Sequence, residues 1–425
     1  MLPWVSILAA LVGSLQFGFQ IAVLNCSIGA VEQSFDITSK TESSLVVSCV
    51  LIGALIGSMI AGSVADVDGP RNALVLCSLV YVCGSLVSGM ADSVYVLMVG
   101  RLVTGIGVGS SSILVPRYLV EISPADARGY VSSLNQVFIC IGILISFAMG
   151  LGYDHDPTFM VLDIQWWRWM VLVPGTIMGI VQAIVMHCRK APESVSTSMD
   201  HVDEEESFLH HDNSGHGEYK SLYSILTSRK YRKIIRLALV IPITQQASGI
   251  NAVILYGSSI MKDVLSPDSS PMKANMMIGV VNLVFSTISS SLIDKIGRRP
   301  CLITSFFGMA ACLFVLSCAH GTTAFWSLIL YVSFFGIGCG GVPWVYLSEI
   351  LPNEIKRHVQ GVATTGNWMT NILVGSTFGF FSGGLGLAFS LYGTLCLLSG
   401  IFCVRYMVET NQKSLAEIHK ELMDD

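Results

Sequence analysis

Uncharged amide side chains recur inside the long apolar stretches of the sequence, where charged side chains are almost absent. A buried amide must find hydrogen-bond partners, because it carries two N–H donors and an acceptor oxygen. Asn367 and Asn371 are four residues apart and share one face of a helix. Gly249 separates two glutamines from Asn251, where it allows a helix to bend and to direct these amides toward one cavity. The amides in apolar stretches are Gln16, Gln20, Asn25, Gln136, Gln182, Gln245, Gln246, Asn251, Asn282, Asn367 and Asn371.

Two indole side chains, Trp344 and Trp368, accompany these amides. Amides and flat rings without charges suit a neutral polyhydroxylated ligand, because amides bond to hydroxyl groups and ring faces cover C–H surfaces. A single buried amide can instead hold two helices together. The number of amides in helices that would line one interface favours a ligand site, and interhelical bonding is the alternative.

The elements that position these side chains must be membrane-spanning helices. Hydrophobic residues make up 52% of the 425 residues and charged residues only 12%, whereas soluble proteins carry about 25% charged residues. The mean hydropathy is +0.65, and a membrane helix needs about 20 mostly apolar residues. This composition excludes soluble enzymes and secreted disulfide scaffolds. The net charge of −5 gives no indication of nucleic acid as a partner.

The apolar stretches predict an all-α membrane protein with twelve transmembrane helices in two six-helix halves. The expected spans are 4–28, 44–65, 72–91, 95–119, 129–152, 168–187, 234–260, 274–293, 300–319, 325–348, 360–381 and 385–406. We expect an N-terminal bundle over residues 1–188, a cytoplasmic and partly disordered linker over 189–233, a C-terminal bundle over 234–407 and a cytoplasmic tail over 408–425. The histidines and acids of the linker have no spacing that fixes a metal geometry, so no metal site is predicted.

The distribution of Lys and Arg predicts the orientation. If both termini are cytoplasmic, only Lys40, Arg168, Lys262 and Lys273 of the 24 basic residues lie on the outer side. This bias follows the rule that basic residues stay on the cytoplasmic side. We therefore expect a multi-pass protein of the cell membrane with both termini in the cytoplasm and with the lipid bilayer as its main surroundings.

The two halves repeat one another. Asp66, Glu121, Pro124 and Arg128 recur as Asp294, Glu349, Pro352 and Lys356, and each pair is 228 residues apart (294 − 66, for example). The acids and bases of these pairs fall at cytoplasmic helix ends, where they can form ion pairs that close an inner gate. Solvated loop charges are the alternative, but they do not explain the shared offset.

Seven segments together resemble the sugar porter family of the major facilitator superfamily, and especially its facilitative hexose transporters. They are GSLQFGF at 13–19, VPRYLVEISPADARG at 115–129, QQASGIN at 245–251, DKIGRRP at 294–300, VPWVYLSEILP at 342–352, NWMTN at 367–371 and ETNQKSLAEI at 409–418. The resemblance implies alternating access around a sugar site between the halves. It also implies a transporter and not an enzyme, with no cofactor and no obligate protein partner.

The resemblance assigns roles to individual residues. The positions that match sugar-contacting residues of the family are Gln136, Gln245, Gln246, Asn251, Asn282, Trp344 and Asn371, and Asn367 and Trp368 flank them. The positions that match the intracellular gate are Glu121, Arg128, Asp294, Arg298, Arg299 and Glu349, and Asp66, Arg71 and Lys356 stand at related gate positions.

Departures from the family pattern affect the expected mechanism. The first-half gate motif reads Asp66-Val67-Asp68-Gly69-Pro70-Arg71, and the loss of two basic positions predicts a weak latch on that side. Proton-coupled relatives resemble this chain in the first span but carry an aspartate in the segment where this chain has Gln20. Because glutamine does not titrate, we expect uniport of a neutral monosaccharide, and the resemblance favours a hexose such as glucose. A non-transporting sugar sensor and a proton-coupled symporter are the alternatives.

Overall fold

The structure is a computed structural model that describes residues 3–124, 127–153, 159–188, 222–264, 270–378 and 384–423. Residues 189–221 of the expected linker, with its predicted partial disorder, therefore lie outside the described residues. Helices dominate the described part of the chain, and one short antiparallel hairpin joins β1 (Met160–Val161) to β2 (Ile164–Gln165). These observations confirm the all-α fold class.

The first half contains six numbered helices and a short 3-10 turn, η1 (Leu151–Tyr153). The helices are α1 (Trp4–Ala22), α2 (Ile28–Ser34), α3 (Lys40–Gly89), α4 (Val94–Ile122), α5 (Arg128–Gly150) and α6 (Trp166–Cys188). The helix α3 covers two expected spans, 44–65 and 72–91. It bends between them at Gly69, whose φ of 78° is non-helical, and Pro70 follows.

The second half follows the same plan with more interruptions. Its helices are α8 (Leu222–Leu226), α9 (Arg232–Ala247), α10 (Ile250–Val264), α11 (Pro271–Ile296), α12 (Arg298–Cys318), α13 (Gly321–Phe334), the π-helical turn η2 (Phe335–Cys339), α14 (Val342–Ile350), α15 (Asn353–Phe378), α16 (Leu385–Tyr406) and α17 (Leu415–Met423). The break expected at Gly249 is present, with a φ of 87°. The expected tail over 408–425 contains α17, which buries Ile418 and Leu422 against the second half.

Within the described residues, ten helical segments are long and apolar enough to cross a membrane. This number is lower than the twelve spans that the sequence predicts, for two reasons. The segment Thr41–Gly89 is counted once but holds two expected spans. The helix α15, in the place of the eleventh expected span, carries several amides and threonines, which lower its hydropathy.

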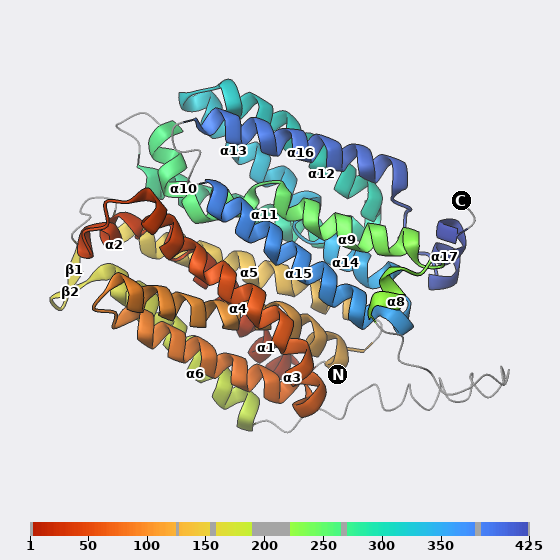
Figure 1. The fold of residues 1–425 in the computed structure, drawn as a ribbon, viewed down its shortest axis with the longest axis horizontal. Coiled ribbons are helices and arrows are strands. Elements are labelled where there is room, and N and C mark those ends of the chain that lie inside the picture. The colour runs from red at the N-terminus through yellow and green to blue at the C-terminus, as the bar shows by residue number, and fades with distance from the viewer. Residues whose placement is uncertain are drawn as a thin grey trace.

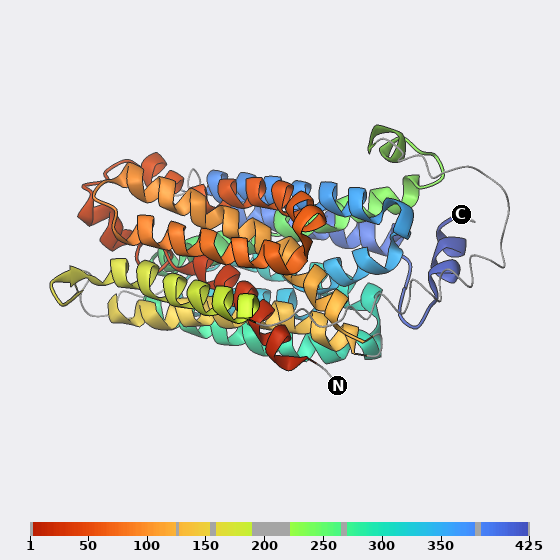
Figure 2. The ribbon, with the colours of Figure 1, turned by 90° about the horizontal axis from the view of Figure 1, so that it is seen from below.

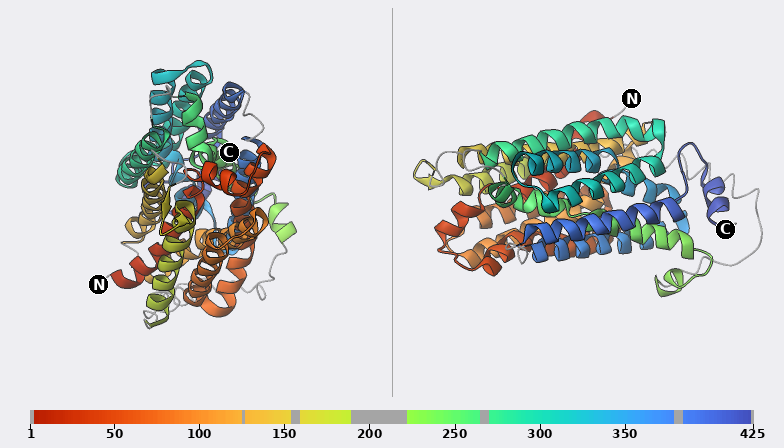
Figure 3. Two further views of the ribbon diagram at one scale, coloured as in Figure 1. Left: turned by 90° about the vertical axis from the view of Figure 1, so that its left-hand side faces the viewer. Right: turned by 90° about the horizontal axis from the view of Figure 1, so that it is seen from above.

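The helices run roughly along the long axis of the molecule and form two bundles (Figures 1 and 2). The end-on view in Figure 3 shows the halves side by side. The halves meet where α5 packs on α11 and α3 packs on α15, with α1 beside α10. The helices α8 and α17 lie at one end of the molecule, which we call the α17 end. The helix α2 and the β-hairpin lie at the opposite end, which we call the α2 end (Figure 1).

Candidate functional site

Four of the predicted amides form one hydrogen-bonded chain inside the second half. Asn251 Nδ2 donates to Gln246 Oε1 at 2.8 Å, and Gln246 Nε2 donates to Asn367 Oδ1 at 3.2 Å. Asn367 Nδ2 donates to Gln245 Oε1 at 3.2 Å and to the Pro242 carbonyl at 2.8 Å. The chain therefore joins α9, α10 and α15 around the break at Gly249.

Gln245 ends this chain on the backbone of η2. Its Nε2 lies 2.7 Å from the Cys339 carbonyl and 3.2 Å from the Gly340 carbonyl. Pro343 has no N–H, so it cannot make the helical bond to the carbonyl four residues earlier, which is that of Cys339. The sequence thus leaves an acceptor open, and the Gln245 amide occupies it.

Asn371 differs from these amides. Its side chain has no exposed surface, and within the described residues neither its Nδ2 nor its Oδ1 has a hydrogen-bond partner. It lies one turn after Asn367 on α15. A buried amide without partners costs roughly 1–3 kcal/mol, which a ligand or water that bonds to it would recover.

Weaker contacts connect the remaining predicted amides across the two halves. Gln136 Nε2 on α5 lies 3.6 Å from Cys140 Sγ, and Cys140 Sγ lies 3.4 Å from Ser286 Oγ on α11. Ser286 Oγ donates to Asn282 Oδ1 at 3.5 Å. These bonds are long, so a ligand hydroxyl can replace them at little cost.

The two predicted indoles occupy different surroundings. Trp368 is buried, and its ring lies 5.8 Å from that of Phe17 on α1, so this aromatic pair also crosses between the halves. Trp344 is half-buried at the start of α14. Within the described residues, neither Trp344 nor Asn371 forms a hydrogen bond with another predicted site residue.

Arg101 is the buried charge of the first half, with 1% of its surface exposed. Its Nη1 donates to Gln20 Oε1 at 3.1 Å and its Nη2 to the Gln20 carbonyl at 2.6 Å. Gln20 Nε2 in turn donates to Ser85 Oγ at 3.1 Å. A neutral amide and a carbonyl thus hold the guanidinium, and no described carboxylate forms an ion pair with it.

Asn25 joins the halves at the α2 end. Its Nδ2 donates to the Ile254 carbonyl at 2.7 Å, and its Oδ1 accepts the Ser258 N–H at 2.7 Å. A regular helix would join these two backbone groups of α10 to each other. Tyr256, between them, has non-helical angles (φ −118°, ψ 15°), so Asn25 contacts α10 where the helix bends.

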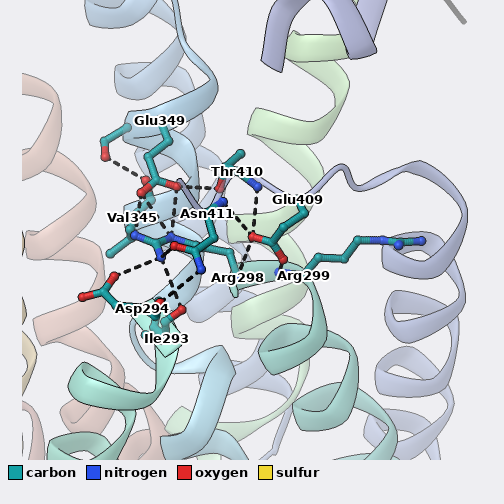
Figure 4. A network of polar contacts seen from close by, with 10 residues as sticks. Ile293, Asp294, Arg298, Arg299, Val345, Glu349, Glu409, Thr410 and Asn411 are labelled. Carbon is teal, nitrogen blue, oxygen red and sulfur yellow. Dashed lines mark hydrogen bonds and ion pairs between the residues drawn. The ribbon is translucent and has the colours of Figure 1, made fainter. Parts of the chain in front are cut away.

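The predicted gate of the second half is an ion-pair network at the α17 end (Figure 4). Arg298 contacts Glu349 through Nη2 at 2.9 Å and Asp294 through Nη1 at 2.9 Å. Its Nη1 also donates to Asn411 Oδ1 at 2.9 Å. Thr410 Oγ1 donates to Glu349 Oε2 at 2.6 Å. Only 11% of the Arg298 side chain is exposed, whereas 66% of the Asp294 side chain is, so the guanidinium is buried at one edge of a network that reaches solvent at Asp294.

Glu409 completes this network from the tail and was not among the predicted gate residues. Its carboxylate accepts the backbone N–H groups of Arg298 at 2.9 Å and Arg299 at 3.0 Å, which begin α12. Carboxylates are stabilising at helix N-termini. Gly297 makes this approach possible, because a Cβ there would lie 2.5 Å from Glu409 Oε2. The segment 409–418, which resembles the family, begins with Glu409 and is the feature of the sequence that could have identified this residue.

The first-half gate uses partners that the motif does not contain. Asp66 accepts Arg117 Nη1 at 2.9 Å and also pairs with Arg357, which lies on α15 of the other half. Arg117 and Arg357 were missed, since neither belongs to the repeated positions. Pro70 occupies the position equivalent to Arg298 at the repeat offset, so this half has no arginine there.

The other predicted gate residues bond mainly to backbone. Arg71 donates to the Met186 and His187 carbonyls at 2.9 Å each, at the end of α6. Lys356 Nζ donates to the Ser348 carbonyl at 3.0 Å, and Arg299 Nη2 to the Val404 carbonyl at 2.7 Å. Glu121 is half-buried and forms no ion pair within the described residues. The Arg128 side chain lies outside them, so its predicted role stays a prediction.

Comparisons with known proteins agree with this architecture. The family model described as "Sugar (and other) transporter" matches residues 5–422. The chain is 31% identical to Plastidic glucose transporter 4 of Arabidopsis thaliana, over 99% of this chain and 80% of that protein. It is 27% identical to the Arabinose-proton symporter of Bacillus subtilis, over 97% and 93% of the two chains. The inward open structure of the xylose transporter XylE from E. coli superimposes with a TM-score of 0.79 at 25% identity and covers 98% of each chain.

Proposed function

The chain belongs to the sugar porter family of the major facilitator superfamily, and from this premise we propose that it carries a hexose such as glucose by facilitated uniport. It is a multi-pass membrane transporter of sugars and not an enzyme. The proposal concerns what membership of the family leaves open, namely the sugar, the energy source and the orientation.

The observation that carries the uniport proposal is the pairing of Arg101 with Gln20. A transporter driven by protons needs a side chain at membrane depth that gains and loses a proton in each cycle. Gln20 cannot titrate, and the Arg101 guanidinium stays protonated. With no described carboxylate paired to Arg101, the sugar gradient alone drives transport.

The amide chain supports a neutral hydroxylated substrate. The nine predicted substrate-binding residues comprise seven amides and two tryptophans and include no charge, so an anionic or cationic substrate would enter without a counter-charge. Asn371, Gln136 and Asn282 have absent or weak partners and offer free hydrogen-bonding groups. We propose that hydroxyl groups of the hexose bind there, while the bonded amides from Gln245 to Asn251 hold the wall of the site.

Contacts between the halves at both ends support alternating access. Asn25 bonds to α10 at the α2 end, and Asp66 pairs with Arg357 at the α17 end. Opening toward either side requires one of these contacts to break while the other persists. We propose that the protein lies in the cell membrane. The α17 end and both termini then face the cytoplasm, because basic residues concentrate at that end. A fluorescent fusion would distinguish the cell membrane from a plastid envelope.

Initial sugar uptake into proteoliposomes, with and without an imposed inward proton gradient, tests the proposal. We expect uptake of a hexose to equilibrium at the same rate in both conditions. Accumulation above equilibrium that collapses on adding a protonophore would instead establish proton symport, the activity named for the Bacillus subtilis relative. Measurable sugar binding without counterflow of any hexose in a panel would establish a sensor.

A further inference from the structure

A group of basic side chains at the α17 end has no role in the sugar site or the gate. Five of the eight residues from Arg229 to Arg236 are basic and none is acidic. Arg405, at the end of α16, belongs to the same group in space, because α9 packs beside α16 (Figure 3). We call Arg229, Lys230, Arg232, Lys233, Arg236 and Arg405 the cationic patch.

Tyr406 lies beside two members of the cationic patch. The Arg236 guanidinium lies 4.3 Å from the centroid of the Tyr406 ring, and that of Arg405 lies 5.6 Å from it. Both arginines are exposed. Two cations held beside one ring repel each other unless an anion lies close to them. Within the described residues, none of the six basic side chains forms an ion pair.

The nearby carboxylates are already engaged. Glu354 accepts the Tyr231 hydroxyl at 2.9 Å, and this bond ties the start of α9 to α15. Glu409 is bonded to the backbone N–H groups that begin α12. Glu354 still carries its charge and acts on Lys230, at one side of the cationic patch. Among the described residues, no carboxylate forms an ion pair with Arg236 or Arg405.

An apolar strip leads to the cationic patch along α16. Leu397, Leu398, Ile401 and Val404 are each 37–56% exposed, and their spacing places them along the helix toward Arg405. Such a strip on a membrane helix faces lipid chains. It ends at exposed arginines where the apolar span of α16 ends, which is the level of lipid headgroups.

We propose that the cationic patch binds the phosphate of an anionic phospholipid, with an acyl chain of that lipid along the α16 strip. Clusters of four to eight basic residues next to a membrane helix attract anionic lipids. Basic residues that only orient the chain during insertion need no particular partners in space. Here two segments 169 residues apart (405 − 236) place their guanidinium groups beside one tyrosine.

Native mass spectrometry of the purified full chain in detergent tests this proposal. The protein is titrated with phosphatidylglycerol and, separately, with phosphatidylcholine. We expect tighter binding of phosphatidylglycerol, and about fivefold weaker binding in Arg236→Gln and in Arg405→Gln. This factor follows from about 1 kcal/mol for each interfacial basic residue. Lys420→Gln, at an exposed position on α17, is the matched control and should bind as the wild type does.

Further experiments distinguish a lipid phosphate from free phosphate and control for variants that unfold. Inorganic phosphate should not displace phosphatidylglycerol, because it has no chain for the apolar strip. If a variant unfolds, raising the salt concentration with the wild-type protein provides the same comparison, and binding should weaken. Equal affinity for both lipids, equal affinity in wild type and both arginine variants, an equal loss in Lys420→Gln, or displacement by inorganic phosphate would each overturn the proposal. Sugar binding, measured in parallel, reports separately on the proposed transport function.

Discussion

The buried amides differ in how many partners the protein already gives them. Gln245 is bonded to two carbonyls and to Asn367, whereas Asn371 has no partner at either amide atom among the residues that the structure describes. Substitution by alanine at these two positions therefore has different consequences for the contacts within the protein. At Gln245 it breaks the contacts that hold η2 against α9. At Asn371 it removes only groups that are available to a ligand.

Asn371→Ala should weaken hexose binding by about 1–3 kcal/mol, the cost of a lost hydrogen bond in a buried site, and leave thermal stability unchanged or slightly higher. Gln245→Ala and Asn251→Ala should weaken binding by a similar amount and also lower thermal stability, since their partners in the protein are left unpaired. Calorimetric titration and thermal unfolding of the same samples measure both quantities. Unchanged affinity in all three folded variants would show that the amides only join helices.

Gln20→Asp should make hexose uptake dependent on pH, because it places a titratable carboxyl beside the Arg101 guanidinium. The control is Gln20→Asn, which has the size of aspartate but stays neutral. The pKa of an aspartate is ordinarily about 4; burial raises it and the Arg101 guanidinium lowers it. Initial uptake rates in proteoliposomes from about pH 4 to about pH 8 therefore compare the two variants. A flat profile for Gln20→Asp, identical to that of Gln20→Asn, would contradict the prediction.

At the scale of elements, the second half contains the broken helices. Its span pairs α9 with α10 and α13 with α14 are interrupted at Gly249 and at η2. Side chains from elsewhere bond to backbone at η2, where Gln245 contacts the Cys339 carbonyl, and at a further bend within α10 near Tyr256, where Asn25 contacts the Ile254 carbonyl. Backbone groups that lack a helical hydrogen bond inside a membrane need such partners. If the side chain can release the backbone group, the segment is able to move.

Asn25→Ala should shift the protein toward opening at the α2 end, because it removes both bonds from the first half to α10. The loss of one or two such bonds, about 1–3 kcal/mol, corresponds to roughly a tenfold change in population. Distances between spin labels on α2 and on α13 measure the opening. Asn275→Ala is the control, since Asn275 bonds to Ser258 Oγ within the second half. Identical distance distributions in Asn25→Ala and wild type would rule out this role.

At the scale of the whole molecule, the two gates at the α17 end differ in burial and connectivity. The network around Arg298 lies within the second half, and only 11% of the Arg298 side chain is exposed. The Asp66 contact to Arg357 joins the halves, but 68% of the Arg357 side chain is exposed. Exposed ion pairs contribute little stability, about 0–1 kcal/mol, so the inter-half contact is easily broken.

Arg357→Gln should favour opening at the α17 end by no more than about fivefold, and high salt should abolish its difference from wild type. Arg117→Gln removes the other partner of Asp66, within the first half, and should leave the opening equilibrium closer to wild type. Spin-label distances between α4 and α15 near the α17 end report on both. A shift with Arg117→Gln as large as that with Arg357→Gln would mean that Asp66 acts within its own half.

Deletion of residues 196–215 should leave uptake within about twofold of wild type. The acidic, weakly hydrophobic composition of this segment predicts that it acts only as a connection between the halves. Uptake normalised to protein in the membrane measures the effect. For comparison, deletion of residues 409–418 should abolish transport, because it removes the Glu409 carboxylate that bonds to the N-terminus of α12. Loss of transport in the 196–215 deletion, with normal amounts in the membrane, would refute the prediction.

The helical membrane fold could be predicted from the sequence alone, and so could the repeat and the acids and arginines that form the ion-pair network of the second half. These features follow from local composition, from spacing along a helix and from a repeat at one offset, which are all properties of the linear chain. Even the break at Gly249 was predictable, because only glycine takes its positive φ easily.

Which polar groups have hydrogen-bond partners, and which partners these are, depends on how the helices pack. Asn25 and Gln245 have the same chemistry as Asn371, yet their amides bond to backbone segments 229 and 94 residues away while that of Asn371 stays free. Asp66 finds Arg357 across 291 residues, at a position outside the repeat. Side-chain hydrogen bonds act over about 3 Å, so a partner is set by how helices pack and not by distance along the chain.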